Sequence, residues 1–94
     1  MDFTSARNNV EGMYSTFLES GGIDTTALEM GAHSAWQALR NMSAAQVESL
    51  KPEQQRDWAY LVQAYNNLPN GVDGQRWQRR WFEAAHELLL RVPD

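Results

Sequence analysis

Apolar residues recur every three or four positions along most of this chain, which is the spacing of one face of an α-helix. Period-two alternation and runs of β-branched residues, the marks of strands, are missing from the sequence. Glycine and proline interrupt the helical pattern at Gly21-Gly22, Lys51-Pro52 and Pro69-Asn70-Gly71. We therefore predict an all-α protein whose helices run from about Phe3 to Glu19, Thr25 to Arg40, Ala44 to Leu50, Pro52 to Leu68 and Gly74 to Arg91.

Three of these helices begin with one shared signature, a capping residue with an apolar residue before it. Asp24, Ser43 and Asp73 can each accept a hydrogen bond from the first turn of the helix that follows. Ser43 and Gln46 together predict a capping box. The apolar residues around each cap predict hydrophobic staples that pair Ile23 with Leu28, Met42 with Val47 and Val72 with Trp77.

Each longer helix has one apolar face, and these faces are expected to form the core. They comprise Phe3, Ala6, Val10, Met13, Tyr14 and Phe17; Leu28, Ala32, Ala35, Leu39 and Met42; Trp58, Leu61, Val62, Tyr65 and Leu68; and Trp77, Trp81, Ala84, Ala85 and Leu88, with Phe82 and Leu89 at the flank. A row of small residues, Ala27, Gly31, Ala35 and Ala38, predicts a close helix–helix contact. The pattern predicts a compact bundle of four longer amphipathic helices plus one short helix, in a single domain over residues 1–94.

Composition then removes several classes of protein. The chain has 94 residues, no cysteine, 43% apolar residues and a net charge of −4, which excludes a disulfide scaffold, a thiolate metal site and a disordered chain. No apolar stretch approaches the ~20 residues of a membrane span, and the first residues lack a signal-peptide pattern, so we expect a cytoplasmic protein without membrane contact. The net charge lies in residues 1–50, and this acidic half suits a basic partner better than nucleic acid.

Motifs for catalysis are missing, since the sequence holds no nucleophile elbow, P-loop or H-E-x-x-H. We therefore predict that the protein is not an enzyme. Glu83 and His86 have the E-x-x-H spacing of di-iron bundles, but those sites need two such steps. Glu29 and His33 are four residues apart and would chelate an ion only weakly. Both histidines are expected at the surface, and neither a metal nor a cofactor is predicted.

Protein binding has more support. Trp36, Arg40, Arg56 and Tyr60 fall at the margin of the apolar faces or outside them, and Met30 and Leu90 also lie away from the predicted core. Tyrosine, tryptophan and arginine dominate binding hot spots. We predict a non-catalytic protein–protein interaction module that uses Trp36, Arg40, Arg56 and Tyr60, with a second copy of the chain as one candidate partner.

Two alternatives stay open. Arg76, Arg79, Arg80 and Arg91 share the outer face of the last helix and would serve a nucleic-acid-associated regulator, although Glu83 and Glu87 on that face favour salt bridges. Trp77 and Trp81 lie one turn apart and would line a small-ligand pocket between helices. In general character alone, with no motif, the chain is similar to many small acidic helical proteins of phages and mobile elements. Some of those inhibit a host complex, such as a defence system, by occupying a basic surface.

Overall fold

Helices account for all the regular structure in the computed structural model, which describes residues 2–69 and 71–93, and the side chains of residues 71–73 lie outside that description. The helices are α1 (Phe3–Glu19), α2 (Thr25–Arg40), α3 (Ala44–Glu48), α4 (Pro52–Ala64) with the 3-10 turn η1 (Tyr65–Asn67), and α5 (Gly71–Leu89). The predicted all-α bundle of four longer helices and one short helix is confirmed.

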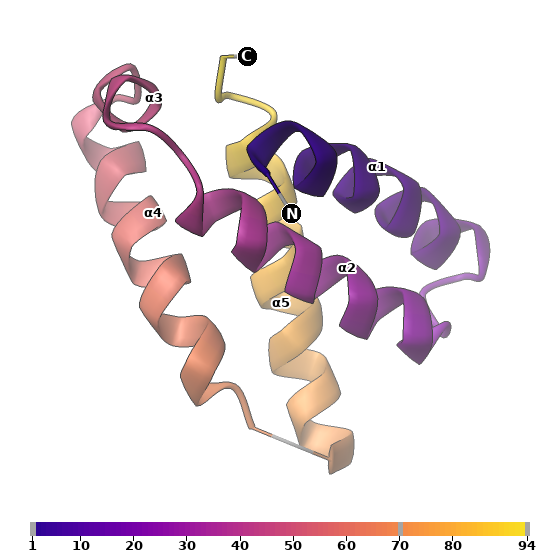
Figure 1. Cartoon of the computed structure of the whole chain (residues 1–94). Helices are drawn as coiled ribbons and strands as arrows, with labels where there is room; N and C mark the ends of the chain where they lie inside the picture. Colours follow the sequence, from indigo (N-terminus) through magenta and orange to yellow (C-terminus); the bar gives the residue numbers. More distant parts are fainter. Residues whose placement is uncertain (1, 70, 94) are drawn as a thin grey trace.

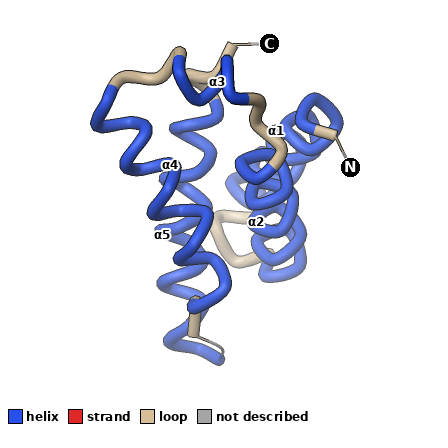
Figure 2. Tube along the Cα trace, turned by 60° about the vertical axis from the view of Figure 1, so that its left-hand side comes forward, coloured by secondary structure: helices blue, strands red, loops and turns tan. Residues whose placement is uncertain are grey.

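Two pairs of helices build the molecule. Figure 1 shows α2 crossing α5, with α1 on one side and α4 on the other. Figure 2 shows α1 beside α2 and α4 beside α5, with α3 at one end. Since α2 packs against α1, α4 and α5, it lies at the centre of the bundle. The chain end closes this arrangement, because Arg7 Nη1 donates to Val92 O at 2.9 Å and Gln46 Nε2 donates to Pro93 O at 3.0 Å.

The limits of α1 and α2 are those predicted, because local chemistry sets them. Asp24 Oδ1 accepts from Ala27 N at 3.0 Å and begins α2. Gly21 and Gly22 follow α1 with φ of 76° and 80°, the left-handed region that glycine adopts without a Cβ clash. The capping box at Ser43 is also confirmed, since Gln46 N donates to Ser43 Oγ at 3.1 Å and Ser43 N donates to Gln46 Oε1 at 2.9 Å.

Several predicted limits were wrong. The helix α3 ends at Glu48, and α4 ends at Ala64, where the chain tightens into η1. Leu68 is extended, because Pro69 disfavours helical backbone at the residue that precedes it. The side chain of Ile23 is 78% exposed, so the staple with Leu28 does not bury it. The last helix begins at Gly71, which places Asp73 inside its first turns, and the predicted cap and staple at Asp73 and Val72 involve side chains outside the described residues.

The buried face of α5 is also rotated from the predicted one. Phe82 and Leu89, predicted at the flank, are fully buried, whereas Trp77 and Ala84, predicted inward, are exposed. Because α1 and α2 cover one side of α5 and α4 covers the other only in part, the centre of the buried stripe moves toward α1 and α2. Trp77 is left at the edge of the α4 side.

Candidate binding groove

The helix α4 is attached to the bundle chiefly through tryptophans. Of its residues, Leu61 alone is buried. Three indole N–H groups instead donate to backbone carbonyl groups in the last turns of a neighbouring helix. These hydrogen bonds join Trp36 to Val62 O at 3.2 Å, Trp58 to Leu39 O at 2.8 Å and Trp81 to Leu61 O at 2.9 Å.

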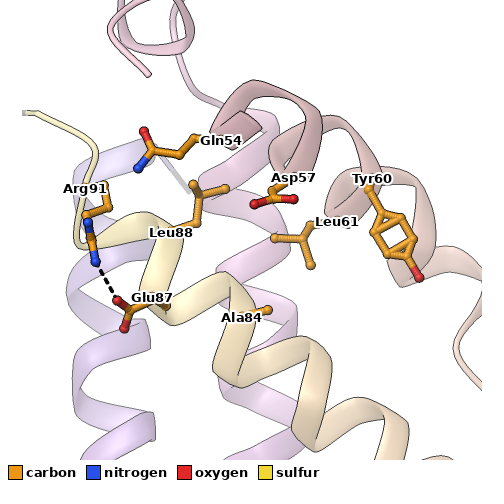
Figure 3. A pocket seen from close by; sticks show the side chains of 8 residues that line it. All are labelled: Gln54, Asp57, Tyr60, Leu61, Ala84, Glu87, Leu88 and Arg91. Atoms are coloured by element: carbon orange, nitrogen blue, oxygen red, sulfur yellow. Dashed lines mark hydrogen bonds and ion pairs between the residues drawn. The ribbon is translucent and has the colours of Figure 1, made fainter. Parts of the chain in front are cut away.

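This attachment leaves a cavity of about 450 Å³ open between the first half of α4 and the end of α5. Apolar side chains form its floor, and in Figure 3 Leu61 and Leu88 lie between the two helices with Ala84 below them. Polar side chains stand around that floor. The full lining is Gln54, Asp57, Tyr60, Leu61, Ala84, Glu87, Leu88 and Arg91.

A second hollow of about 370 Å³ continues along the same two helices. Tyr60 lines both hollows, so we treat them together as the α4/α5 groove. The side chains of Tyr60 and Trp77 are 67% and 50% exposed, and both stand at the groove. The second hollow is lined by Tyr60, Gln63, Ala64, Asn67, Leu68, Pro69 and Trp77.

The charges of the groove lie at one end. Arg91 Nη2 lies 2.9 Å from Glu87 Oε1, four residues earlier in the chain, so these two charges offset each other. The exposed carboxylate of Asp57 forms no ion pair with any other described residue. At the opposite end the lining carries no acid, and the Arg80 guanidinium lies 5.5 Å from the centre of the Trp77 ring. One uncompensated negative charge therefore marks the Asp57 end.

The predicted partner-binding residues fall into two separate pairs. Trp36 and Arg40 lie together on α2, with the Arg40 guanidinium 4.3 Å from the Trp36 ring centre and Trp36 stacked on Tyr65 at 4.9 Å. Arg56 and Tyr60 are exposed one turn apart on α4. Trp36 contacts α4 at Val62, which lies roughly 200° around the helix from Tyr60. The two pairs therefore face different sides of α4.

The four arginines of the nucleic-acid alternative are exposed but dispersed. Arg79 lies 3.4 Å from Glu83 and stacks on Phe17 at 5.4 Å, while Arg91 pairs with Glu87 in the groove. Arg76 shares a hollow with Arg79 at the junction of α1 and α2. Arg76 lies in the first half of α5, whereas Arg91 lies beyond the end of that helix at Leu89. Two of the four charges are therefore already paired with carboxylates.

The two histidines lie in different environments. His33 is exposed, as predicted, but His86 is only 14% exposed, stacked on the Tyr14 ring at 3.9 Å, with Nε2 3.0 Å from Glu11 Oε1. The prediction of a surface position for His86 was wrong because the buried face of α5 is rotated toward α1. Burial at the same contact raises the pKa of Tyr14, and the charge of Glu83 adds to that effect. Among the described residues, no three acid or histidine side chains gather as a metal ion would require.

The aromatic pair of the small-ligand alternative is split. Trp81 is 4% exposed and lies beneath α4, whereas Trp77 stands at the second hollow of the groove. The two rings therefore line no common hollow of the groove. Sequence reasoning missed Trp77 as a surface residue, and the signal that could have found it is its neighbours, since Arg76, Gln78 and Arg80 leave it alone among polar side chains.

No helix in the described part of the chain has both the length and the apolar character that a bilayer crossing requires. No protein-family model, curated protein sequence or solved structure matches this chain.

Proposed function

We propose that the protein is a non-catalytic protein–protein interaction module and that the α4/α5 groove is its contact surface. The observation that carries this proposal is the position of Tyr60 and Trp77, two largely exposed aromatic side chains beside a hollow with an apolar floor. Aromatic side chains at the edge of an apolar hollow are the arrangement in which hot spots of binding energy occur. Their contact with water is unfavourable until a partner covers them.

The charge of the chain supports a partner with a basic surface. Residues 1–50 carry the whole net charge of −4, and Asp57 adds an unpaired carboxylate at the groove itself. Complementary charge accelerates encounter and excludes partners of like charge. Occupation of a basic surface would inhibit a complex that needs that surface, and we propose this as the action by which such a module would work.

Trp36 is a poor position at which to test the proposal. Its indole N–H is bonded to Val62 O, so its removal would loosen α4 as well as any contact. Tyr60 and Trp77 have no such structural hydrogen bond in the described part of the chain, and their loss would leave the core intact. Met30, which is 51% exposed on α2 and lies outside the groove, provides the matched control.

The test is affinity purification from the lysate of the native host with the wild-type chain, Tyr60→Ala, Trp77→Ala and Met30→Ala. Circular dichroism first establishes that all four are equally helical. We expect one enriched protein that is lost with both groove variants and kept with Met30→Ala. Equal recovery of that protein with both groove variants would contradict the groove as the contact surface.

Nucleic-acid binding through Arg76, Arg79, Arg80 and Arg91 is the alternative proposal, and the ion pairs of Arg79 and Arg91 weaken its support. A mobility-shift experiment at ~50 mM salt decides it, because low salt favours phosphate contacts. A shift that disappears on charge reversal of these arginines would favour the alternative over the interaction module.

A further inference from the structure

We infer that the occupant of the α4/α5 groove is an amphipathic helix of the partner that brings a lysine or arginine to Asp57. This inference rests on the proposed function and adds the chemistry of the occupant to it. Three features of the groove lead to it: what its walls are made of, how long it is, and where its charge lies.

The walls favour a helix over an extended segment. Both are α-helices, whose backbone N–H and C=O groups are bonded within the helix, so they present side chains and no open backbone edge. An extended segment laid over the apolar floor would lose water from its own N–H and C=O groups without a backbone edge to bond to, at a substantial cost for each unpaired group. A helix satisfies those groups internally and offers a row of side chains to the apolar floor.

The length of the groove sets the size of that helix. Its lining extends along α4 and η1 from Gln54 to Asn67, which corresponds to roughly 20 Å at 1.5 Å per residue. A helix of about 14 residues spans that distance. Apolar side chains at positions i, i+4 and i+7 of such a helix would follow the floor past Leu88, Leu61 and Leu68.

The charge of the groove determines which charged side chain the occupant helix should carry. Asp57 is exposed beside Leu61 and has no ion-pair partner among the described residues, whereas the carboxylate of Glu87 is held by Arg91. The opposite end offers the amides of Gln63 and Asn67. A cationic side chain on the occupant would therefore be favoured at the Asp57 end alone, and it would fix the direction in which the helix lies.

The experiment uses a display library of roughly 14-residue peptides with randomised surfaces on a helical framework, the length that spans the groove. The library is selected on the wild-type chain and depleted on Tyr60→Ala. We expect enriched peptides with apolar residues at i, i+4 and i+7 and a lysine or arginine beside that row. A proline placed at the middle of an enriched peptide should abolish its binding, since proline breaks a helix.

Charge variants of the protein then test the contact with Asp57. For an enriched peptide we expect Asp57→Asn to weaken affinity about 2- to 5-fold, because exposed ion pairs contribute modestly, and Asp57→Lys to weaken it more than ~10-fold through repulsion. The effect should shrink in high salt, which screens exposed charges. Glu19→Gln, an exposed acid at the end of α1 and away from the groove, is the matched control and should leave affinity unchanged.

The outcomes separate this inference from the proposed function. Enriched peptides that need Tyr60 but are acidic, proline-rich or indifferent to Asp57→Lys would overturn the basic helix while they support the groove. A library without enrichment also overturns the basic helix, and the lysate experiment then decides the proposed function by itself. A dimer that is lost with Tyr60→Ala, seen by sedimentation, would replace the partner helix with a second copy of the chain.

Discussion

The contact between α1 and α2 and the attachment of α4 hold helices together in opposite ways. Between α1 and α2, small side chains allow the two helices to approach closely. The polar side chains of Asn9 and Ser34 at this contact form a hydrogen bond with each other. Between α4 and its neighbours, large indole rings span the space and bond to carbonyl groups. Hollows remain beside both contacts, one of about 360 Å³ lined by residues of α1 and α2 and one of about 450 Å³ between α4 and α5.

The α4/α5 groove differs from the hollow beside α1 and α2 in the side chains at its edge. Tyr60 and Trp77, two largely exposed aromatic residues, line the groove, whereas Met30 and polar residues line the other hollow. The helix α4 is fixed at a few strong points and keeps its side facing the end of α5 uncovered. The bundle thus combines a closely packed half with a half that is both anchored and accessible.

Removal of an indole that holds α4 to the bundle should have the largest effect on stability. We expect Trp81→Ala to lower the free energy of unfolding by about 3–5 kcal/mol, because it leaves a large cavity beneath α4 and removes the hydrogen bond to Leu61 O. Trp77→Ala, which removes an exposed ring, should change stability by less than about 0.5 kcal/mol. Urea denaturation followed by circular dichroism measures both. Similar losses for the two would contradict the assignment of Trp81, and not Trp77, as a residue that holds α4 to the bundle.

Addition of a methyl group to the closely packed half should have the next largest effect. A Cβ on Gly31 would meet the ring of Phe82 and lie 3.0 Å from Met13 Cβ, and the buried ring cannot move aside. We expect Gly31→Ala to lower stability by about 1–3 kcal/mol, although alanine favours helix. Gly12→Ala, which meets no atom within 4 Å, should raise stability by about 0.5–1 kcal/mol. Thermal unfolding of the pair measures the contrast, and a stabilised Gly31→Ala would disprove close packing there.

Removal of a helix cap should have a still smaller effect on stability. Ser43→Ala loses the acceptor for Gln46 N and should lower stability by about 1 kcal/mol. Ser15→Ala, an exposed position within α1, should be neutral or slightly stabilising because alanine has the higher helix propensity. Urea midpoints compare the two. Equal midpoints would show that the short helix contributes nothing to the cooperative unit.

Alkaline pH should lower the stability of the protein through one tyrosine in each half, whereas neutral pH should leave the protonation of both tyrosines unchanged. Burial raises the pKa of Tyr14, at the contact of α1 with α5, and of Tyr65, which stacks on Trp36. The unfolded chain therefore loses these protons first, near pH 10, while the folded chain keeps them, so stability should fall as pH rises above about 10. Tyr14→Phe and Tyr65→Phe should each reduce the steepness of that fall, as measured by unfolding at stepped pH. An unchanged slope in both variants would contradict the burial of these hydroxyls.

Features set by neighbours in sequence were predictable. The limits of α1 and α2 follow from Asp24 and the glycine pair, and the start of α3 follows from the capping box. The close contact of α2 with its neighbours also followed from the row of small residues, since all four are buried and Gly31 lies against Phe82 of α5 and Met13 of α1.

Features set by the arrangement of helices were not predictable. Spacing alone placed Trp77 with Trp81, because residues four apart share a face, but the width of that face depends on which helices cover α5. The same uncertainty placed His86 at the surface and Phe82 at the flank. Tyr60 was identified by its polar neighbours, whereas the groove beside it needs two helices at a distance that no single periodicity specifies.

Three of the four indoles are bonded to carbonyls, and the fourth is half exposed to water. The tryptophan fluorescence of the protein therefore depends on what covers its surface. The fluorescence of an indole shifts to shorter wavelength when water leaves its surroundings, and Trp77 is the exposed indole that stands at the groove. A partner that binds in the groove should therefore shift the fluorescence emission of the unlabelled protein to shorter wavelength. The chain thus carries its own probe of the groove's occupancy. Trp77→Phe removes this signal, while the three indoles that are bonded to carbonyls continue to report on the fold.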